Sequence, residues 1–247
     1  MESVKSALRL FELVAAQGEI GVSELARLTN QPKTTVQRGL RTLHEAGWLR
    51  PAGAGARRRW AVSTRLILLA RSLDPSPRLK RSALASMQDL RDFTGETIHL
   101  MLRDGDEVVL IERLDSLKTL RTVRPLGARA PLHVAANGKA VLANLSPEDQ
   151  ARYLGGQLSR WTPRTLTDPD VLRRELNQVR ACGYAYSDGE LDLDVRAVAA
   201  AIVDAEGQPV GSLSISCPAS RLEQAMVEPY GRRLAEAARA ISARYAG

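Results

Sequence analysis

The chain contains 247 residues, of which 44% are hydrophobic and 26% are charged. This composition is typical of a globular protein and excludes a disordered chain, and the length is sufficient for two domains with a sizeable core. The sequence has no apolar run long enough to span a membrane, and its first residues lack the apolar segment of a signal peptide. We therefore expect a cytoplasmic protein without a membrane partner.

The net charge of +7 is confined to the N-terminal third of the chain. Residues 1–73 contain twelve Lys or Arg and five Asp or Glu, whereas residues 74–247 contain twenty-three of each kind. A small basic domain attached to a larger neutral one is typical of a protein in which the basic domain binds a polyanion and the larger domain has a different function. The alternative is a basic surface that is merely solvated.

Three short helices are predicted in the first 46 residues. Apolar residues recur at helical spacing over 2–17, 22–29 and 33–46. Between the last two, Asn30 tolerates the left-handed backbone that ends a helix, and Pro32 suits the first turn of the next. These two helices form a predicted helix–turn–helix, a shape that is common in DNA-binding proteins and also occurs in others.

The free face of the third helix carries the side chains that we expect to contact DNA. Lys and Arg neutralise phosphates, Arg, Gln and Thr reach base edges in the major groove, and the N–H groups of a first helical turn bind phosphate. The candidates are Lys33, Thr34, Thr35, Gln37, Arg38 and Arg41.

A β-hairpin is predicted directly after the helix–turn–helix. An extended segment begins at Trp48, the Gly-containing loop 51–56 turns the chain, and residues 57–62 return as a second strand. A hairpin at this place is a wing. Its positively charged residues, which we expect to contact the phosphate backbone or the minor groove, are Arg57, Arg58 and Arg59. The alternative is a solvated turn.

A second domain is predicted after a linker. Residues 64–73 have the pattern of a short helix, and two prolines in the next four residues stop it. We therefore expect a DNA-binding domain over 1–63, a linker over 64–77 and a second domain over 78–247.

The second domain is predicted to have an α+β fold. Its expected strands are 97–103 and 107–114, joined by an Asp-Gly turn, then 118–123 as a candidate third strand, 197–204 and 209–216. Its expected helices are 78–93, 135–145, 147–154, 170–182 and 220–245. Hairpins with helices between them and at both ends are typical of the α+β class.

Several stretches, taken in order, resemble the IclR family of bacterial transcription regulators. SVKSALRLFELVA and SELARLTNQPKTTVQRGLRTLHEAGWL are similar to that family's N-terminus, and FTGETIHLMLRDGDEVVLIERLDS, RAPLHVAANGKAVLA and RAVAAAIVDAEGQPVGSLSISCPASRL to its effector-binding domain. The resemblance implies a winged helix–turn–helix, a linker helix and a ligand domain similar to the GAF fold. It also implies homodimers, usually paired into homotetramers, that bind double-stranded promoter DNA and a small-molecule effector.

The resemblance also implies which residues line the effector site. These are Thr119, Thr122, Ala136, Asn137, Ser187, Asp188, Ala197, Ser214 and Ser216. Serines two apart in a strand face the same side, and backbone N–H groups at the helix start near Ala136 can hold a carboxylate, so the site suits a small organic acid. Ala197 stands where family members often have Cys, Ser187 near a usual acidic residue, and Asp194 where Gly is common. These departures leave room for a bulkier acid, such as an aromatic one.

The sequence contains no motif for catalysis, a metal or a cofactor. Residues 137–139 lack the rest of a phosphate loop, so Lys139 is expected to face solvent or pair with a carboxylate. The alternating acids of 188–194 lack key positions of a calcium loop and predict a solvated loop, and His99 is expected to be a packing histidine. We therefore expect a regulator and not an enzyme. The alternatives are a ligand-independent architectural DNA binder and a small-molecule enzyme anchored by a basic head.

Overall fold

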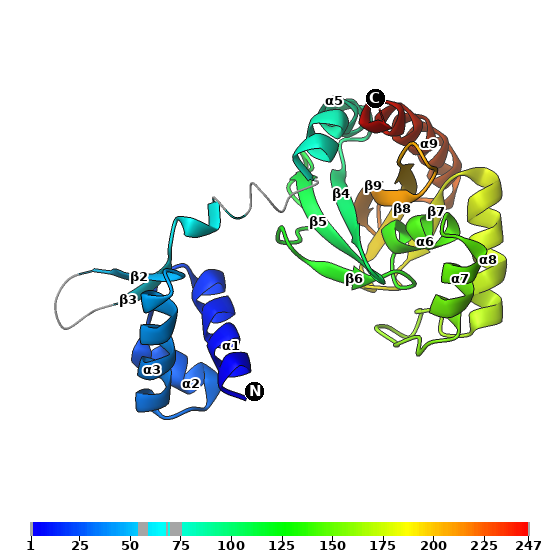
Figure 1. Ribbon diagram of the computed structural model, residues 1–247. Coiled ribbons are helices and arrows are strands. Elements are labelled where there is room, and N and C mark those ends of the chain that lie inside the picture. Colours follow the sequence, from blue (N-terminus) through cyan, green and yellow to red (C-terminus); the bar gives the residue numbers. More distant parts are fainter. Residues whose placement is uncertain (1, 54–58, 68, 70–75, 247) are drawn as a thin grey trace. The chain divides into compact units, whose positions relative to one another are not determined.

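The computed structural model describes residues 2–53, 59–67, 69 and 76–246. The chain divides into two compact units between residues 74 and 75 (Figure 1). Each unit has its own buried apolar core, as the composition predicts. Among the residues just given, no helix is long and apolar enough to cross a membrane.

The N-terminal unit is a winged helix–turn–helix. Its helices pack around a core that includes Leu10, Val14, Leu40 and Trp60, and its small sheet has the strand order β1-β3-β2. The elements are α1 (Glu2–Gln17), β1 (Ile20–Gly21), α2 (Val22–Thr29), α3 (Lys33–Glu45), β2 (Leu49–Ala52) and β3 (Arg59–Val62). The three predicted helices and the hairpin are therefore confirmed.

The turn between α2 and α3 forms as its sequence predicts. Asn30 has a φ of 51° in the left-handed region, and the N–H of Gln31 donates to the carbonyl of Ala26 at the end of α2. The Gln31 amide also exchanges hydrogen bonds with the hydroxyl of Ser6 on α1, at 2.9 and 3.1 Å. The turn is thereby tied to a third helix, which fixes the angle at which α3 leaves it.

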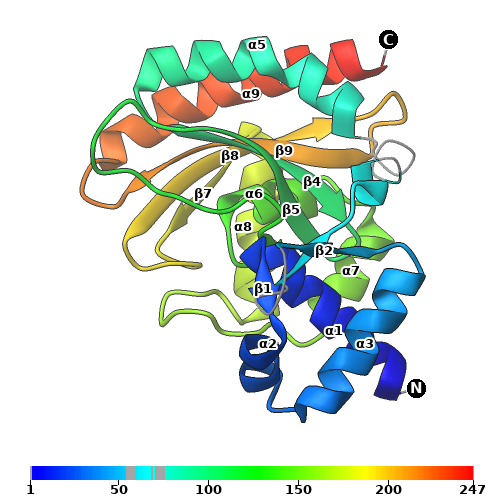
Figure 2. The ribbon, with the colours of Figure 1, turned by 90° about the vertical axis from the view of Figure 1, so that its left-hand side faces the viewer.

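The C-terminal unit is an antiparallel sheet with helices on both faces. The strand order is β6-β5-β4-β9-β8-β7. Helices α5 and α9 cover one face, and α6, α7 and α8 lie on the other (Figure 2). The elements are α5 (Ser76–Thr94), β4 (Thr97–Asp104), β5 (Glu107–Leu114), β6 (Arg129–Pro131), α6 (Ala136–Ala143), α7 (Pro147–Leu154), α8 (Pro169–Cys182), β7 (Ala185–Asp188), β8 (Val195–Val203), β9 (Pro209–Pro218) and α9 (Gln224–Ala246). The predicted α+β class is confirmed.

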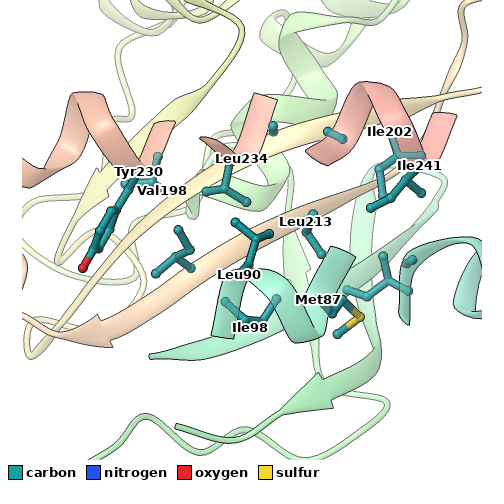
Figure 3. Close-up of a cluster of buried hydrophobic side chains, with 14 of the residues drawn as sticks. Met87, Leu90, Ile98, Val198, Ile202, Leu213, Tyr230, Leu234 and Ile241 are labelled. Atoms are coloured by element: carbon teal, nitrogen blue, oxygen red, sulfur yellow. The ribbon is translucent and has the colours of Figure 1, made fainter. Parts of the chain in front are cut away.

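Alternation along the central strands sends successive side chains to different layers. Ile98 and Leu213 pack against Leu90 of α5 and Leu234 of α9 (Figure 3). Met101, which lies on the opposite face of β4, packs instead with the α6 layer. The residues that alternate with the α5–α9 core on β4, β8 and β9 therefore face α6, and this is where the cavity lies.

Three expectations about the second unit are wrong. Residues 117–125 are not a strand, because the edge of β5 is occupied by β6, and side chains bind carbonyls of this segment instead. The first helix begins at Ser76 and not at residue 78, because proline is accommodated in a first helical turn. The last helix begins at Gln224 and not at residue 220. Residues 68 and 70–75 of the expected linker lie outside the described residues, whereas residues 65–67 and 69 are helical as predicted.

Candidate DNA interface and ligand cavity

Helix α3 presents a polar, basic face to solvent. Val36, Leu40 and Leu43 bury the opposite side in the core of the unit. The structure places the six predicted DNA contacts together on this one helix: Lys33, Thr34, Gln37, Arg38 and Arg41 are exposed and Thr35 is half-buried. The exposed groups are separated by helical spacing, so they form a continuous stripe of the kind that enters a major groove.

The first turn of α3 is open to an anion. Pro32 precedes the helix without a side-chain cap, and the first turn contains no acidic residue. The N–H groups of Thr35 and Val36 both donate to the carbonyl of Pro32, which leaves those of Lys33 and Thr34 without a helical acceptor. Free N–H groups and the positive end of the helix dipole favour a phosphate there.

Of the three arginines predicted in the wing, Arg59 lies within the described residues. Arg59 is turned toward its own unit: its guanidinium donates to the carbonyl of Glu19 at 2.6 and 3.1 Å and lies 3.7 Å from the carboxylate of Glu24. Its strand pairs with β1, and this register brings the side chain to Glu19. Arg57 and Arg58 lie outside the described residues.

The C-terminal unit contains a cavity of about 690 Å³ on the α6 side of the sheet. Its floor is formed by β4, β8 and the end of β9, and its walls by β5, the start of α6 and two loops, 120–125 and 191–194. The lining includes apolar side chains such as Met101, Val108 and Leu110 together with polar and charged ones. A volume and lining of this kind are typical of small-molecule sites.

Six of the nine predicted effector residues line this cavity. They are Thr122, Ala136, Asn137, Ser187, Ala197 and Ser216. Ser214 lies behind Asn137, Thr119 is exposed in the irregular loop, and Asp188 is held by Arg196 and Arg164 at 2.7 and 2.9 Å. These two ion pairs and hydrogen bonds lower the pKa of the Asp188 carboxyl, and Asp188 is absent from the lining. The structure thus brings most of the predicted set together but not all of it.

A clamp of two serines holds Asn137 at the cavity wall. The hydroxyl of Ser212 donates to the Asn137 amide oxygen at 2.9 Å, and the amide nitrogen donates to the hydroxyl of Ser214 at 2.9 Å. Ser216, two residues further, accepts a hydrogen bond from the hydroxyl of Thr122 at 3.2 Å. Ser212 was missed, although it lies on the same strand face as the two predicted serines.

His99 is a cavity residue that sequence reasoning missed. Its side chain is 5% exposed and lines the cavity, and its Nε2 atom has no hydrogen-bond partner among the described residues. Burial, with smaller contributions from the nearby charges of Arg124 and Arg113, lowers the pKa of His99 to about 4. The imidazole is therefore neutral at pH 7. Strand alternation with Met101 was the signal that could have placed it on this face.

Lys139 is fully buried and paired with two carboxylates. Its Nζ donates to Glu190 Oε1 at 2.6 Å and also to Glu175. Of the two expected arrangements for Lys139, exposure to solvent or pairing with a carboxylate, the structure shows the second. The expectation of a solvated loop is wrong at Glu190, which is only 7% exposed. Burial raises the pKa of the Glu190 carboxyl, and the charge of Lys139 opposes that rise.

The two units match two family models in order. Residues 3–53 match the IclR helix-turn-helix domain, and residues 75–243 match the bacterial transcriptional regulator IclR C-terminal domain. The chain belongs to the IclR family. It is a DNA-binding transcription regulator of that type, in agreement with the resemblance of its sequence.

Relatives within the IclR family extend over the whole chain. The HTH-type transcriptional regulator KdgR of Escherichia coli is 35% identical, over 98% of this chain and 93% of its own. The transcriptional repressor IclR of the same organism is 30% identical, over 100% of this chain and 91% of its own.

Solved IclR-family structures share the fold. The Thermotoga maritima IclR is 29% identical, with a TM-score of 0.81 and full coverage of both chains. An IclR homolog of Microbacterium hydrocarbonoxydans, solved in complex with 4-hydroxybenzoate, is 26% identical, with a TM-score of 0.80 and 98% coverage of both chains. Among the residues that the structure describes here, no group of three or more His, Cys, Asp or Glu is arranged to hold a metal ion.

Proposed function

We propose that this IclR-family regulator binds a small organic acid in the cavity of its C-terminal unit, and that binding changes its affinity for promoter DNA. The cavity is the observation that carries the proposal. Its volume of about 690 Å³ is suited to a molecule larger than a two- or three-carbon acid, and an aromatic acid is of suitable size. The relative that was solved with 4-hydroxybenzoate supports this class of ligand.

The start of α6 favours an anion within the cavity. Ala135 occupies the N-cap position and has no side chain that can cap the helix, and Ala135, Ala136 and Asn137 all line the cavity. The first-turn N–H groups and the positive end of the helix dipole therefore face the ligand space. A carboxylate placed there gains hydrogen bonds without displacing a protein group.

The exposed stripe on α3 is the proposed DNA-reading surface. Lys33, Thr34, Thr35, Gln37, Arg38 and Arg41 would contact the major groove and its phosphates, with Arg57 and Arg58 of the wing on the backbone. We further propose that the chain assembles as a homodimer or homotetramer, so that paired heads bind a pseudo-palindromic site. It would act in the cytoplasm, where promoter DNA is found, through binding and not catalysis. Residues 64–77 would couple the two units.

The effector controls DNA binding only if it binds the DNA-competent and DNA-incompetent states with different affinities. The test begins with the full-length protein and a random DNA pool, from which the preferred operator is selected. A panel of aliphatic and aromatic carboxylates is then screened for a dose-dependent rise in melting temperature, which a ligand specific for the folded state must produce.

Each ligand that raises the melting temperature is titrated into the operator complex. A shift in operator affinity supports the proposal, and it should disappear when the cavity is filled by Ala197→Phe. Absence of any binding ligand in the panel, or binding without a change in operator affinity, would count against an acid effector and favour the ligand-independent alternative.

A further inference from the structure

The charged groups that line the cavity come from two loops of opposite charge. Two arginines, Arg121 and Arg124, lie on the loop 120–125, and two carboxylates, Asp192 and Asp194, lie on the loop 191–194. The two loops approach the sheet from different strands. A ligand that fills the cavity therefore meets cations on one loop and anions on the other.

Arg124 supplies the positive charge of one end, beside β4 and β5, and the neutral imidazole of His99 adds hydrogen-bonding capacity there. The carbonyl of Arg124 accepts a hydrogen bond from the guanidinium of Arg113, and Arg113 is the cross-strand partner of His99. The side chain of Arg124 has no hydrogen bond or ion pair with any residue that the structure describes, and the buried Nε2 of His99 is likewise without a partner there. The guanidinium of Arg124 and the imidazole of His99 can therefore both form hydrogen bonds to a ligand, and a carboxylate is the group that best matches them.

The start of α6 adds to this cationic end. Ser214, which accepts the hydrogen bond from Asn137, is the cross-strand partner of His99 between β9 and β4. The uncapped first turn of α6 is thus held beside the imidazole. Its N–H groups and the side chain of Arg124 favour the same charge on a ligand.

Asp192 and Asp194 define the anionic end beside the other edge of the cavity floor. The carbonyl of Asp194 accepts from the N–H of Ala219 at 2.7 Å, directly after β9. The next residue, Val195, pairs with Pro218 at the start of β8. The N–H of Asp194 donates to the carboxylate of Asp192 at 3.2 Å, so the two acids are held together.

The two ends are separated both across the sheet and along it. His99 on β4 and Asp194 beside the start of β8 are two strand positions apart, roughly 10 Å at about 4.8 Å per strand. They are also offset along the strands, because Ser214 pairs with both His99 and Ala199, and Ala199 lies five residues after Asp194. Apolar or small side chains, including Met101, Leu110 and Ala197, also line the cavity. A short acid is too small to contact both ends of the cavity. The side chains at the two ends extend toward each other and shorten the distance that the ligand must span. An acid with an aromatic ring, or with an aliphatic chain as long as such a ring, can therefore contact both ends.

We infer that the effector is a monocarboxylate with an apolar middle and a hydrogen-bond donor, a hydroxyl or an amine, at its far end. Arg124 and His99 bind the carboxylate, and Asp192 and Asp194 accept the hydrogen bond from the donor. This inference rests on the proposed function, because it assigns the chemistry of the same cavity. It makes Arg124 and Asp194 the residues that determine specificity.

The test uses the full-length protein and four probes in calorimetric titrations. 4-Hydroxybenzoate carries both end groups, benzoate carries only the carboxylate, phenol carries only the donor, and pyruvate is a short acid. Wild type should bind 4-hydroxybenzoate more tightly than benzoate and benzoate more tightly than pyruvate. Tighter binding of pyruvate than of both aromatic acids would overturn the inference.

Two variants separate the ends. Arg124→Gln should weaken binding of 4-hydroxybenzoate and of benzoate by at least roughly 10-fold, because a charge-assisted hydrogen bond is lost, and leave phenol unchanged. Asp194→Asn should weaken 4-hydroxybenzoate several-fold and leave benzoate unchanged. The matched controls are Arg232→Gln and Asp170→Asn, which remove exposed charges on α9 and α8 away from the cavity lining. Equal affinities of Arg124→Gln and wild type for both carboxylates would overturn the assignment.

Failure of this inference is distinguishable from failure of the proposed function. If pyruvate or another short acid binds most tightly and shifts operator affinity, the two-ended ligand is wrong but the proposed function stands. If 4-hydroxybenzoate binds with the predicted variant pattern and leaves operator affinity unchanged, the cavity chemistry is supported and the regulatory role is not.

Discussion

The Nζ atom of Lys139 lies 2.6 Å from Oε1 of Glu190, and the lysine side chain is entirely buried. This pair joins α6 to the loop 189–194, and both elements contribute lining residues to the cavity. Thr165 strengthens the same attachment, because its hydroxyl donates to the carbonyl of Glu190 at 2.6 Å. One wall of the cavity is therefore held in place by a buried charge and not by apolar packing alone.

Removal of the lysine charge should destabilise the C-terminal unit strongly. In Lys139→Met the carboxylates of Glu175 and Glu190 lose their shared cation while Glu190 stays buried, and breaking a buried ion pair costs about 3–5 kcal/mol. Urea unfolding of the full-length protein measures this loss.

The companion variant is Lys139→Met combined with Glu190→Gln. Because it removes the uncompensated buried charge, it should recover part of the lost stability. A single variant as stable as wild type, or a double variant no better than the single one, would show that the pair does not hold the loop.

His99 should make stability depend on pH below neutrality. Its pKa is lowered from the ordinary value of 6.5 to about 4, so the unfolded chain binds a proton in that range that the folded chain does not. Stability is then fully present above pH 6.5 and is lost as the pH falls toward 4. The contribution is on the order of 3 kcal/mol for a shift of this size.

The measurement compares urea unfolding of wild type and His99→Gln at several pH values. Wild type should lose more stability than the variant between pH 6.5 and pH 4, whatever the difference between them at pH 7. Parallel pH profiles for the two proteins would contradict a depressed pKa for His99.

Features that depend on local chemistry were predictable from the sequence. The turn at Asn30 and Pro32 is specified by residues that tolerate a left-handed backbone and a first helical turn, and it forms as expected. The face of α3 follows from the 3.6-residue period. Six of the nine residues that the family resemblance placed at the effector site line the cavity, because the order of the strands is shared across the family.

Features that depend on distant partners were not predictable. Lys139 meets Glu175 and Glu190 only because α6, α8 and the loop after β7 converge. Residues 118–123 have apolar and β-branched side chains that suit a strand, but β6 occupies the edge of β5, and Arg221 binds the carbonyl of Leu120. In both cases tertiary contacts decide the outcome.

Gly138 should tolerate no side chain. A Cβ at this position would lie 2.5 Å from the carbonyl oxygen of Leu132 and 2.6 Å from its Cα, and backbone atoms do not move aside as a flexible side chain does. Gly138→Ala should therefore cost about 1–3 kcal/mol of stability through overpacking and weaken binding in the cavity, because α6 must shift away from the backbone of Leu132. The control is Gly21→Ala, which has no atom within 4 Å of the new Cβ and a φ of −90°. Equal melting temperatures for both variants would contradict the close approach.

Arg38 and Arg59 should differ in their effect on DNA binding, although both are exposed arginines of the N-terminal unit. Arg38 projects from α3 into solvent, whereas the guanidinium of Arg59 is bound to the carbonyl of Glu19 and lies beside Glu24. Arg38→Ala should weaken binding to the selected operator by about 1–3 kcal/mol, as loss of a base contact does. Arg59→Ala should lower the stability of the unit with little effect on operator affinity.

Fluorescence anisotropy at several salt concentrations distinguishes the two arginines. A phosphate contact at Arg59 would reduce the dependence of affinity on salt by about one counterion, because neutralised phosphates release bound cations. We expect Arg59→Ala to keep the wild-type salt dependence of DNA binding and to have a lower melting temperature. The reason is that the hydrogen bonds of the Arg59 side chain hold β3 to the segment before α2. A reduced salt dependence in Arg59→Ala together with unchanged operator affinity in Arg38→Ala would reverse the assignment and place the main contact on the wing.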